Sequence, residues 1–248
     1  MIQFFRRIRQ NLLSEGKTGK YLTYALGEII LVVIGILIAL QINTWNEGRK
    51  EIKKSKALLE EFRKDLVRDT LESNYVLGKL EDQVKLERWA LTLVSYDPSH
   101  RDSLRKVFLG PYYQQPITVR TFNKLQNSEN PNLTGFPDLQ NELTQYYTDT
   151  KYLLDAYNEE EKHHAFENEI NQIIRSKMEI DVADFPLLPR DNNQPEAMLD
   201  FAQSIQGRNY IKENYMRRKG MIRYFQSLKQ QAKEIIELID LSLKKDSL

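Results

Sequence analysis

The sequence predicts an all-α fold: an N-terminal transmembrane helix that continues into an elongated extramembrane bundle of three long helices with short connecting helices. Three observations lead to this prediction. An uncharged apolar run extends from Ile29 to Leu40, apolar residues after it recur at helical spacing, and no segment shows the sustained alternation of a strand. We therefore expect a basic amphipathic segment over 1–20, a transmembrane signal anchor over 21–45 and a helical-bundle domain over 46–248.

The first segment has the pattern of a short helix that lies on an anionic membrane surface. Ile2, Phe5, Ile8 and Leu12 fall on one helical face, and arginines gather on the other side. The same residues are also typical of the charged region that precedes a signal anchor, and the two interpretations are compatible.

The apolar run is too short to span a membrane by itself, but its flanks extend it. From Tyr21 to Trp45 the only charged residue is Glu28, and a helix of this length measures about 37 Å, enough to cross a hydrocarbon core of about 30 Å. A soluble core helix is rarely apolar on every face. A cleaved signal peptide needs small residues after its apolar region, whereas Ala39 is followed by bulky and polar residues. We predict an uncleaved anchor.

Basic residues lie on both sides of the anchor, so the charge difference between its two flanks is small. An N-terminal basic segment followed by a long exported chain is the common signal-anchor layout, which favours a cytoplasmic N-terminus. The sequence therefore predicts that the chain crosses the membrane once, with the long segment after the anchor outside the cytoplasm.

The block "FFRRIRQNLLSEGKTGKYLTYALGEIILVVIGILIALQINTWNEGRK" resembles a large family of single-span proteins of Bacteroidota that is known only as a domain of unknown function. The resemblance is closest over residues 3–50, where "GEI-LVVIGILIALQIN-WNE" is distinctive. It implies a bacterial inner-membrane protein whose bulk lies outside the cytoplasm; together with the orientation above, this predicts a cytoplasmic N-terminus and a periplasmic bulk. It implies no activity and no site residues.

The membrane helix is predicted to continue to about Tyr96, because the segment that follows it contains no proline. Two series of residues recur every seven positions there, offset by four, as in the seam of a coiled coil. The first series contains Ile52, Leu59 and Leu66.

Asp97 and Pro98 predict the end of this helix and the cap of a new one. Short helices are expected over 99–109 and 118–126, followed by a second long helix from Pro137 to about Ile180. A short helix after Pro195 and a third long helix over about 208–244 complete the bundle.

Composition and motifs exclude several classes of function. The 36 Lys and Arg residues against 35 Asp and Glu residues give no excess of basic charge for nucleic acid, and the chain has no cysteine. Neither a nucleophile motif nor a catalytic triad is present. Two Glu-x-x-His pairs, Glu160 with His163 and Glu161 with His164, place a carboxylate and an imidazole on one helical face, but we interpret them as a solvated charged face. We predict no enzyme activity, no catalytic residue, no metal and no cofactor.

One face of the membrane helix combines small and polar residues. At about 100° per residue, its members fall within about 60° of Glu28. They are Glu28, Val32, Gly35, Ala39 and Asn43. Small residues let two membrane helices approach closely and polar groups then bond across the contact. We therefore predict a homo-oligomer whose contact continues into the seam at Ile52, Leu59 and Leu66.

The predicted function is a membrane-anchored, self-associating helical module that acts as a periplasmic scaffold, sensor-like or assembly component without catalysis. Its partners are membrane lipid and other copies of the chain, with a further protein partner left open. The first alternative is a small oligomeric channel or proton-coupled device that uses Glu28. The second is an enzyme or metal-dependent protein that uses residues 160–167.

Overall fold

The computed structural model describes residues 18–177, 179, 184–185 and 194–245. Within these ranges the secondary structure is helical and contains no strand, as predicted. The chain divides into two compact units, Met1–Ser55 and Lys56–Leu248. Most of the predicted surface segment over 1–20 lies outside the described residues.

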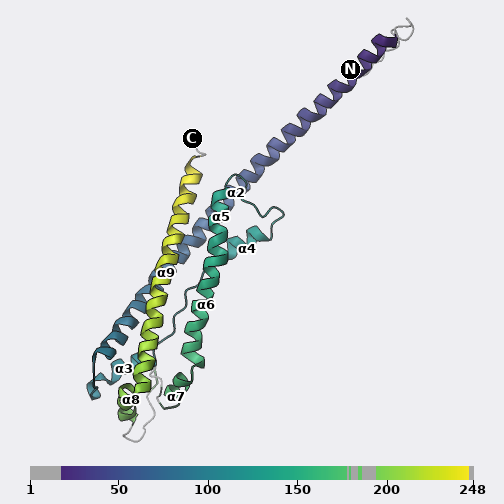
Figure 1. Cartoon of the computed structure of the whole chain (residues 1–248). Coiled ribbons are helices and arrows are strands. Elements are labelled where there is room, and N and C mark those ends of the chain that lie inside the picture. Colours follow the sequence, from purple (N-terminus) through teal and green to yellow (C-terminus); the bar gives the residue numbers. More distant parts are fainter. Residues whose placement is uncertain (1–17, 178, 180–183, 186–193, 246–248) are drawn as a thin grey trace. The chain divides into compact units, whose positions relative to one another are not determined.

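The first unit consists, where it is described, of the beginning of helix α2, which runs without a break from Thr18 to Thr92 (Figure 1). Its apolar side chains are exposed on every face of the helix, and Leu37 is 59% exposed. Near the end of the apolar stretch the guanidinium of Arg49 lies 5.0 Å from the ring centroid of Trp45. No packing within the described chain accounts for the apolar composition of this stretch.

The second unit contains the rest of α2 and a series of shorter and longer helices. They are η1 (Pro98–His100), α3 (Arg101–Phe108), α4 (Arg120–Gln126), α5 (Pro137–Gln145), η2 (Tyr146–Thr150), α6 (Lys151–Lys162), η3 (His163–Glu167), α7 (Glu169–Lys177), α8 (Gln194–Gln203) and α9 (Ile205–Lys245). As predicted, Asp97 caps η1: its carboxylate accepts the backbone N–H of Ser99, and Pro98 occupies the first position.

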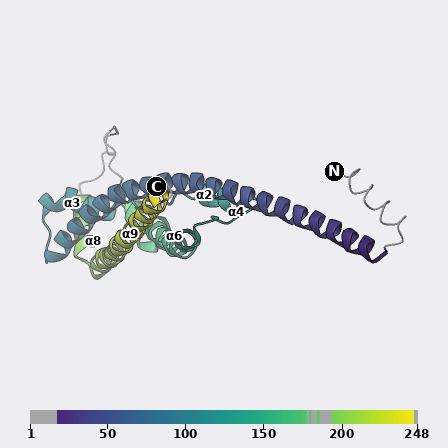
Figure 2. The same cartoon turned by 90° about the horizontal axis from the view of Figure 1, so that it is seen from above.

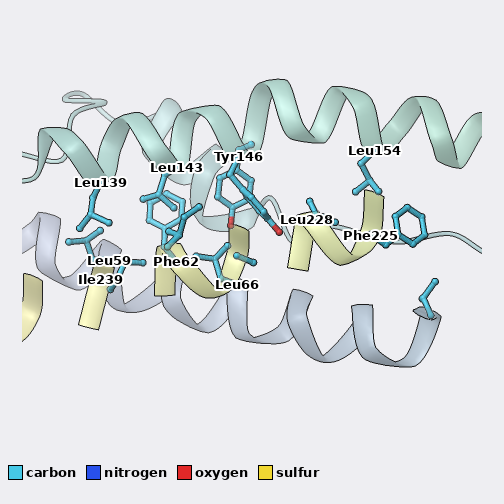
Figure 3. Packing of buried hydrophobic residues seen from close by; sticks show 14 of the residues in the cluster. Leu59, Phe62, Leu66, Leu139, Leu143, Tyr146, Leu154, Phe225, Leu228 and Ile239 are labelled. Atoms are coloured by element: carbon cyan, nitrogen blue, oxygen red, sulfur yellow. The ribbon is translucent and has the colours of Figure 1, made fainter. Parts of the chain in front are cut away.

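Three long helical stretches lie side by side in this unit, namely the second part of α2, the α5–α6 stretch and α9 (Figures 1 and 2). Arg63 pairs with Asp240 and Glu87 pairs with Arg218, so α9 runs antiparallel to α2. Two core clusters fill the space between the helices. In the first cluster Leu59, Phe62 and Leu66 of α2 face Leu139 and Leu143 of α5 (Figure 3).

The seven-residue series predicted on α2 is therefore the stripe that α2 buries in its own chain. Leu59, Leu66 and Leu80 of the first series are each 0% exposed, and Leu77 and Val84, which belong to the series offset by four, are also buried. A buried stripe of this kind is the expected pattern of a helix packed on one side.

The second long helix differs from the prediction, because it ends before Glu169. Asn168 is extended, with φ −63° and ψ 131°, and its side chain accepts the N–H of Ile170 as an N-cap does. The side-chain amide of Asn171 donates to the carbonyl oxygens of His164 and Ala165, which replaces helical bonds at the break. The predicted end near Ile180 lies outside the described residues.

Candidate functional site: a buried arginine–glutamate cluster

Four charged side chains from three helices meet inside the second unit. Glu87 comes from α2, Glu161 from α6, and Arg217 and Arg218 from α9; both carboxylates are 0% exposed. Arg217 donates from Nε and Nη2 to Oε2 of Glu161, at 2.9 and 2.7 Å. Arg218 donates from Nη1 to Glu87 and from Nη2 to Oε1 of Glu161, the latter at 3.4 Å. We call these four residues the Arg–Glu cluster.

The local sequence explains why these charges are held inside. Glu161 lies seven residues after Leu154, two turns further along the same buried face of α6. Arg218 lies between Asn214 and Met221 on the buried face of α9. The cluster therefore occupies positions that a packed helix would normally fill with apolar residues.

Neighbouring groups complete the environment of the cluster. The backbone N–H of Tyr113 donates to Oε1 of Glu161 at 3.3 Å, and the Tyr113 ring centroid lies 5.7 Å from the guanidinium carbon of Arg218. Burial raises the pKa of Glu87, against the opposing charge of Arg218. Burial alone would lower the pKa of Arg218, but Glu87 and Glu161 outweigh it and raise this pKa.

The four charges sum to zero, so they compensate one another rather than an external group. Buried ion pairs of this kind add little net stability compared with apolar packing, but removing one partner leaves the other charge buried and costs about 3–5 kcal/mol. These ion pairs connect α2, α6 and α9 at one level of the bundle.

A surface groove of 910 Å³ adjoins the cluster. Gln83 and Leu86 of α2, Arg105 and Lys106 of α3, and Tyr113 are among its lining residues. Gln83 is buried, and its Nε2 donates to the carbonyl oxygen of Lys106 at 3.3 Å. The volume is in the range of small-molecule sites, and the lining combines cationic, carboxylate, amide and aromatic groups.

Gly110 is needed at the edge of this groove. A Cβ at this position would lie 2.6 Å from the carbonyl oxygen of Lys106 and 3.3 Å from Oε1 of Gln83. Any larger residue would therefore push the chain away from α2 and α3 at this point.

A second group of buried carboxylates, Asp65 and Asp69, lies on α2 to the N-terminal side of Glu87. Oδ2 of Asp65 accepts the N–H and hydroxyl of Thr121, at 3.2 and 2.5 Å, and Oδ1 of Asp69 accepts the N–H of Thr118 at 2.9 Å. These bonds hold the first turn of α4 and the segment before it against α2. Burial raises the pKa of Asp69 to about 6. Its Oδ2 and the hydroxyl of Tyr146 are buried without a hydrogen-bond partner among the described residues.

The residues of the predicted contact between membrane helices lie in the first unit and are not covered by other parts of the described chain. Val32 is exposed, as are Ala39 and Asn43, and Glu28 is half-exposed. A Cβ added to Gly35 would meet no atom within 4 Å. The side-chain amide of Asn43 donates to Oε1 of Glu47 at 3.0 Å, so this residue has a partner in its own helix.

The predicted seam residues are placed differently from the predicted membrane contact. Ile52 is half-buried, whereas Leu59 and Leu66 are fully covered by their own chain, in the core of Figure 3. Intramolecular packing thus accounts for Leu59 and Leu66. We therefore confine the proposed contact between copies to the membrane helix.

The Glu-x-x-His pairs do not form as the sequence spacing suggests. Oε1 of Glu160 lies 3.0 Å from Nε2 of His164, and Nδ1 of His163 lies 3.0 Å from Oε2 of Glu167. Glu161 turns inward, so the interpretation of a solvated face is wrong for this residue. No group of three or more His, Asp or Glu side chains is placed to hold a metal within the described part of the chain.

Sequence reasoning missed the Arg–Glu cluster, although a signal was present. Leu154 and Tyr157 are apolar residues at helical spacing in the second long helix, and Glu161 falls on their face at the next turn. A charged residue on an apolar stripe indicates a buried partner.

The structure thus defines a helical protein with a candidate transmembrane helix. Among the described residues, α2 is long and apolar enough to cross a membrane, and its apolar window is not buried. Residues 28–94 match the model of a family of unknown function, DUF6090. This match begins at Glu28 in the candidate span and ends just after α2. No curated protein and no solved structure matches the chain.

Proposed function

We propose that the protein is a membrane-anchored, self-associating helical module that acts as a scaffold, sensor-like or assembly component, without catalysis. The observation that carries this proposal is the contrast within α2, whose apolar residues are exposed on every face between Leu22 and Trp45, whereas most of those from Leu59 onward form one buried stripe. Water is an unfavourable environment for such an uncovered helix, whereas the bilayer core is a favourable one.

The proposed topology is a single span of a bacterial inner membrane, with the N-terminus in the cytoplasm and the second unit in the periplasm. The basic N-terminal segment and the length of chain after the span support this orientation. Alkaline phosphatase fused after Leu248 should be active, and green fluorescent protein fused there should be dark. The opposite pattern would reverse the orientation.

The proposed contact between copies follows the face of Glu28, Val32, Gly35, Ala39 and Asn43. Lipid gives apolar helices no hydrophobic reason to associate, so close backbone approach at Gly35 and Ala39 has to supply the contact energy. The open space around Gly35 supports this, because no atom of the described residues lies within 4 Å of a Cβ placed there.

Crosslinking tests the contact directly, because the chain contains no cysteine and each introduced cysteine is unique. Single cysteines placed along residues 27–45 should crosslink in native membranes with helical periodicity, with maxima near 35 and 39. Gly35→Leu combined with Ala39→Leu should weaken crosslinking at the neighbouring positions. Val33→Leu, on another face, is the matched control and should leave it unchanged. A flat profile would leave a monomeric anchor.

A further inference from the structure

The part of α2 that directly follows the candidate span carries basic side chains that the proposed function does not use. Trp45, which is 62% exposed, ends the apolar stretch, and Arg49 and Lys53 follow it at intervals of four residues. At about 100° per residue, these three side chains lie within about 80° of one another around the helix. Arg49 and Lys53 are both exposed. We call Trp45, Arg49 and Lys53 the basic face.

The carboxylates of this stretch lie on the opposite side of α2. Glu47 and Glu51 are the only acidic residues between the span and the second unit, and each is about 160° from Arg49 around the helix. Oε1 of Glu47 accepts the side-chain amide of Asn43 at 3.0 Å, and Oε1 of Glu51 pairs with Nζ of Lys54 at 2.6 Å. The basic face therefore carries two positive charges and no carboxylate.

The distance from the apolar stretch places the basic face at the level of lipid headgroups. Arg49 lies four residues beyond Trp45, which is about 6 Å along the helix axis, and the headgroup region extends about 5–8 Å beyond the hydrocarbon core. Helical side chains lean toward the N-terminus of their helix, which for α2 is the side of the span. The long side chain of Lys53, about 12 Å beyond Trp45, therefore leans toward the same region.

The chemistry of the basic face favours a phosphate group. A guanidinium offers parallel N–H donors to two oxygens of one phosphate, and the ammonium group of Lys53 adds a second charge. The guanidinium carbon of Arg49 lies 5.0 Å from the ring centroid of Trp45, so the indole ring holds this group at the edge of the apolar stretch. A lipid with a net negative charge suits two such cations, whereas a zwitterionic headgroup contains its own ammonium group.

We infer that the basic face binds the headgroup of an anionic glycerophospholipid. Arg49 and Lys53 bind its phosphodiester, and Trp45 packs beside the glycerol, at the depth where aromatic belts lie. The inference rests on the proposed function, because the basic face meets headgroups only if the first part of α2 lies in lipid. It adds to that function a preference for one class of lipid.

The test measures lipid preference at Trp45, with the full chain reconstituted in vesicles. Trp89→Phe leaves Trp45 as the single tryptophan, because the chain contains two. Phospholipids with brominated acyl chains quench the fluorescence of a tryptophan that they touch. Vesicles of phosphatidylcholine mixed with brominated phosphatidylglycerol therefore give the relative binding constant of the anionic lipid. Each basic side chain near anionic headgroups favours binding about fivefold, so we expect a preference of about tenfold or more.

Arg49→Gln combined with Lys53→Gln should reduce this preference to near equality of the two lipids. Lys50→Gln combined with Lys54→Gln is the matched control, because it removes the same charge from the same stretch of α2 but outside the basic face. This control should keep the preference within about twofold of the parent chain. No preference in the parent chain, or equal losses of preference in the two double variants, would overturn the headgroup site.

Brominated phosphatidylcholine alone separates a failure of the headgroup site from a failure of the anchor. It should quench Trp45 in the parent chain and in both double variants, because this quenching requires only that the span lies in lipid. Quenching by this lipid without a preference for phosphatidylglycerol would overturn the headgroup site and leave the anchor. The absence of quenching by either lipid would overturn the anchor and, with it, the headgroup site.

Discussion

The two parts of α2 are built from the same apolar residues but have opposite surroundings. Leu37 in the first unit is 59% exposed, whereas Leu66 in the second unit is 0% exposed. In the first part apolar residues occupy every face, and in the second they form one stripe with charged faces around it. A stripe indicates a partner inside the chain, whereas an apolar surface on all sides indicates a partner outside it.

The two units also differ in the surroundings of their carboxylates. Glu161 is enclosed by two arginines of the same chain, whereas Glu28 lies half-exposed in the candidate span. The largest expected effect follows from this contrast. Glu161→Gln removes the charge that two buried guanidiniums share, and we expect it to lower the free energy of unfolding by about 3–5 kcal/mol.

Glu28→Gln is the matched control, and it should leave the unfolding of the second unit unchanged. Urea unfolding of the full chain in detergent, followed by circular dichroism, measures both variants. Equal losses of unfolding free energy for Glu161→Gln and Glu28→Gln would contradict the distinction between the two units.

Truncating a leucine in each part of α2 should give the next largest effect. Leu66→Ala opens a cavity among Leu59, Phe62 and their partners in Figure 3, and should cost about 3 kcal/mol. Leu37→Ala touches no described side chain of the core, so the urea midpoint of the second unit should not move. A shift for Leu37→Ala as large as that for Leu66→Ala would show that the first part packs on the protein.

Replacing Asp69 should have a smaller effect on the free energy of unfolding, and one of opposite sign. Its folded-state pKa of about 6 lies above the ordinary value of 3.8, so the folded protein holds this proton more tightly than the unfolded chain. Stability is therefore greatest below the ordinary pKa and is lost as pH rises through about 6. Asp69→Asn should add about 2 kcal/mol at pH 7.5 and flatten the pH dependence of Tm between pH 4 and 6.

The exposed Asp149→Asn is the control for Asp69 and should change neither Tm nor its pH profile. An Asp69→Asn variant that is less stable than the wild type at pH 7.5 would contradict the assigned cost of burying this carboxylate.

Much of the fold could be predicted from the sequence, because local rules determine it. The all-α class, the continuous α2, the cap at Asp97 and the long α9 follow from periodicity and capping residues. The break at Asn168 could not be predicted in this way, because it depends on the Asn171 side chain reaching back to two carbonyl oxygens. An apolar periodicity does not reveal such a bond.

The candidate site was harder to predict because its members are distant in the sequence. Glu161 meets Arg217 only when α6 and α9 lie antiparallel, and Glu87 comes from a third helix. Periodicity shows that Glu161 lies on a buried face, but not which arginine compensates its charge. The exposed face of Glu28, Gly35 and Ala39, by contrast, follows from helical spacing alone.

The central claim is that the first part of α2 lies in lipid, and cysteine labelling tests it most directly. A membrane-impermeant maleimide would be applied to membranes opened on both sides, with single cysteines at Leu31, Leu37 or Lys53. The account predicts rapid labelling at 53, and no labelling at 31 or 37 until detergent denaturation. If cysteines at positions 31 and 37 were labelled as fast as the cysteine at position 53, the first part of α2 would not lie in lipid.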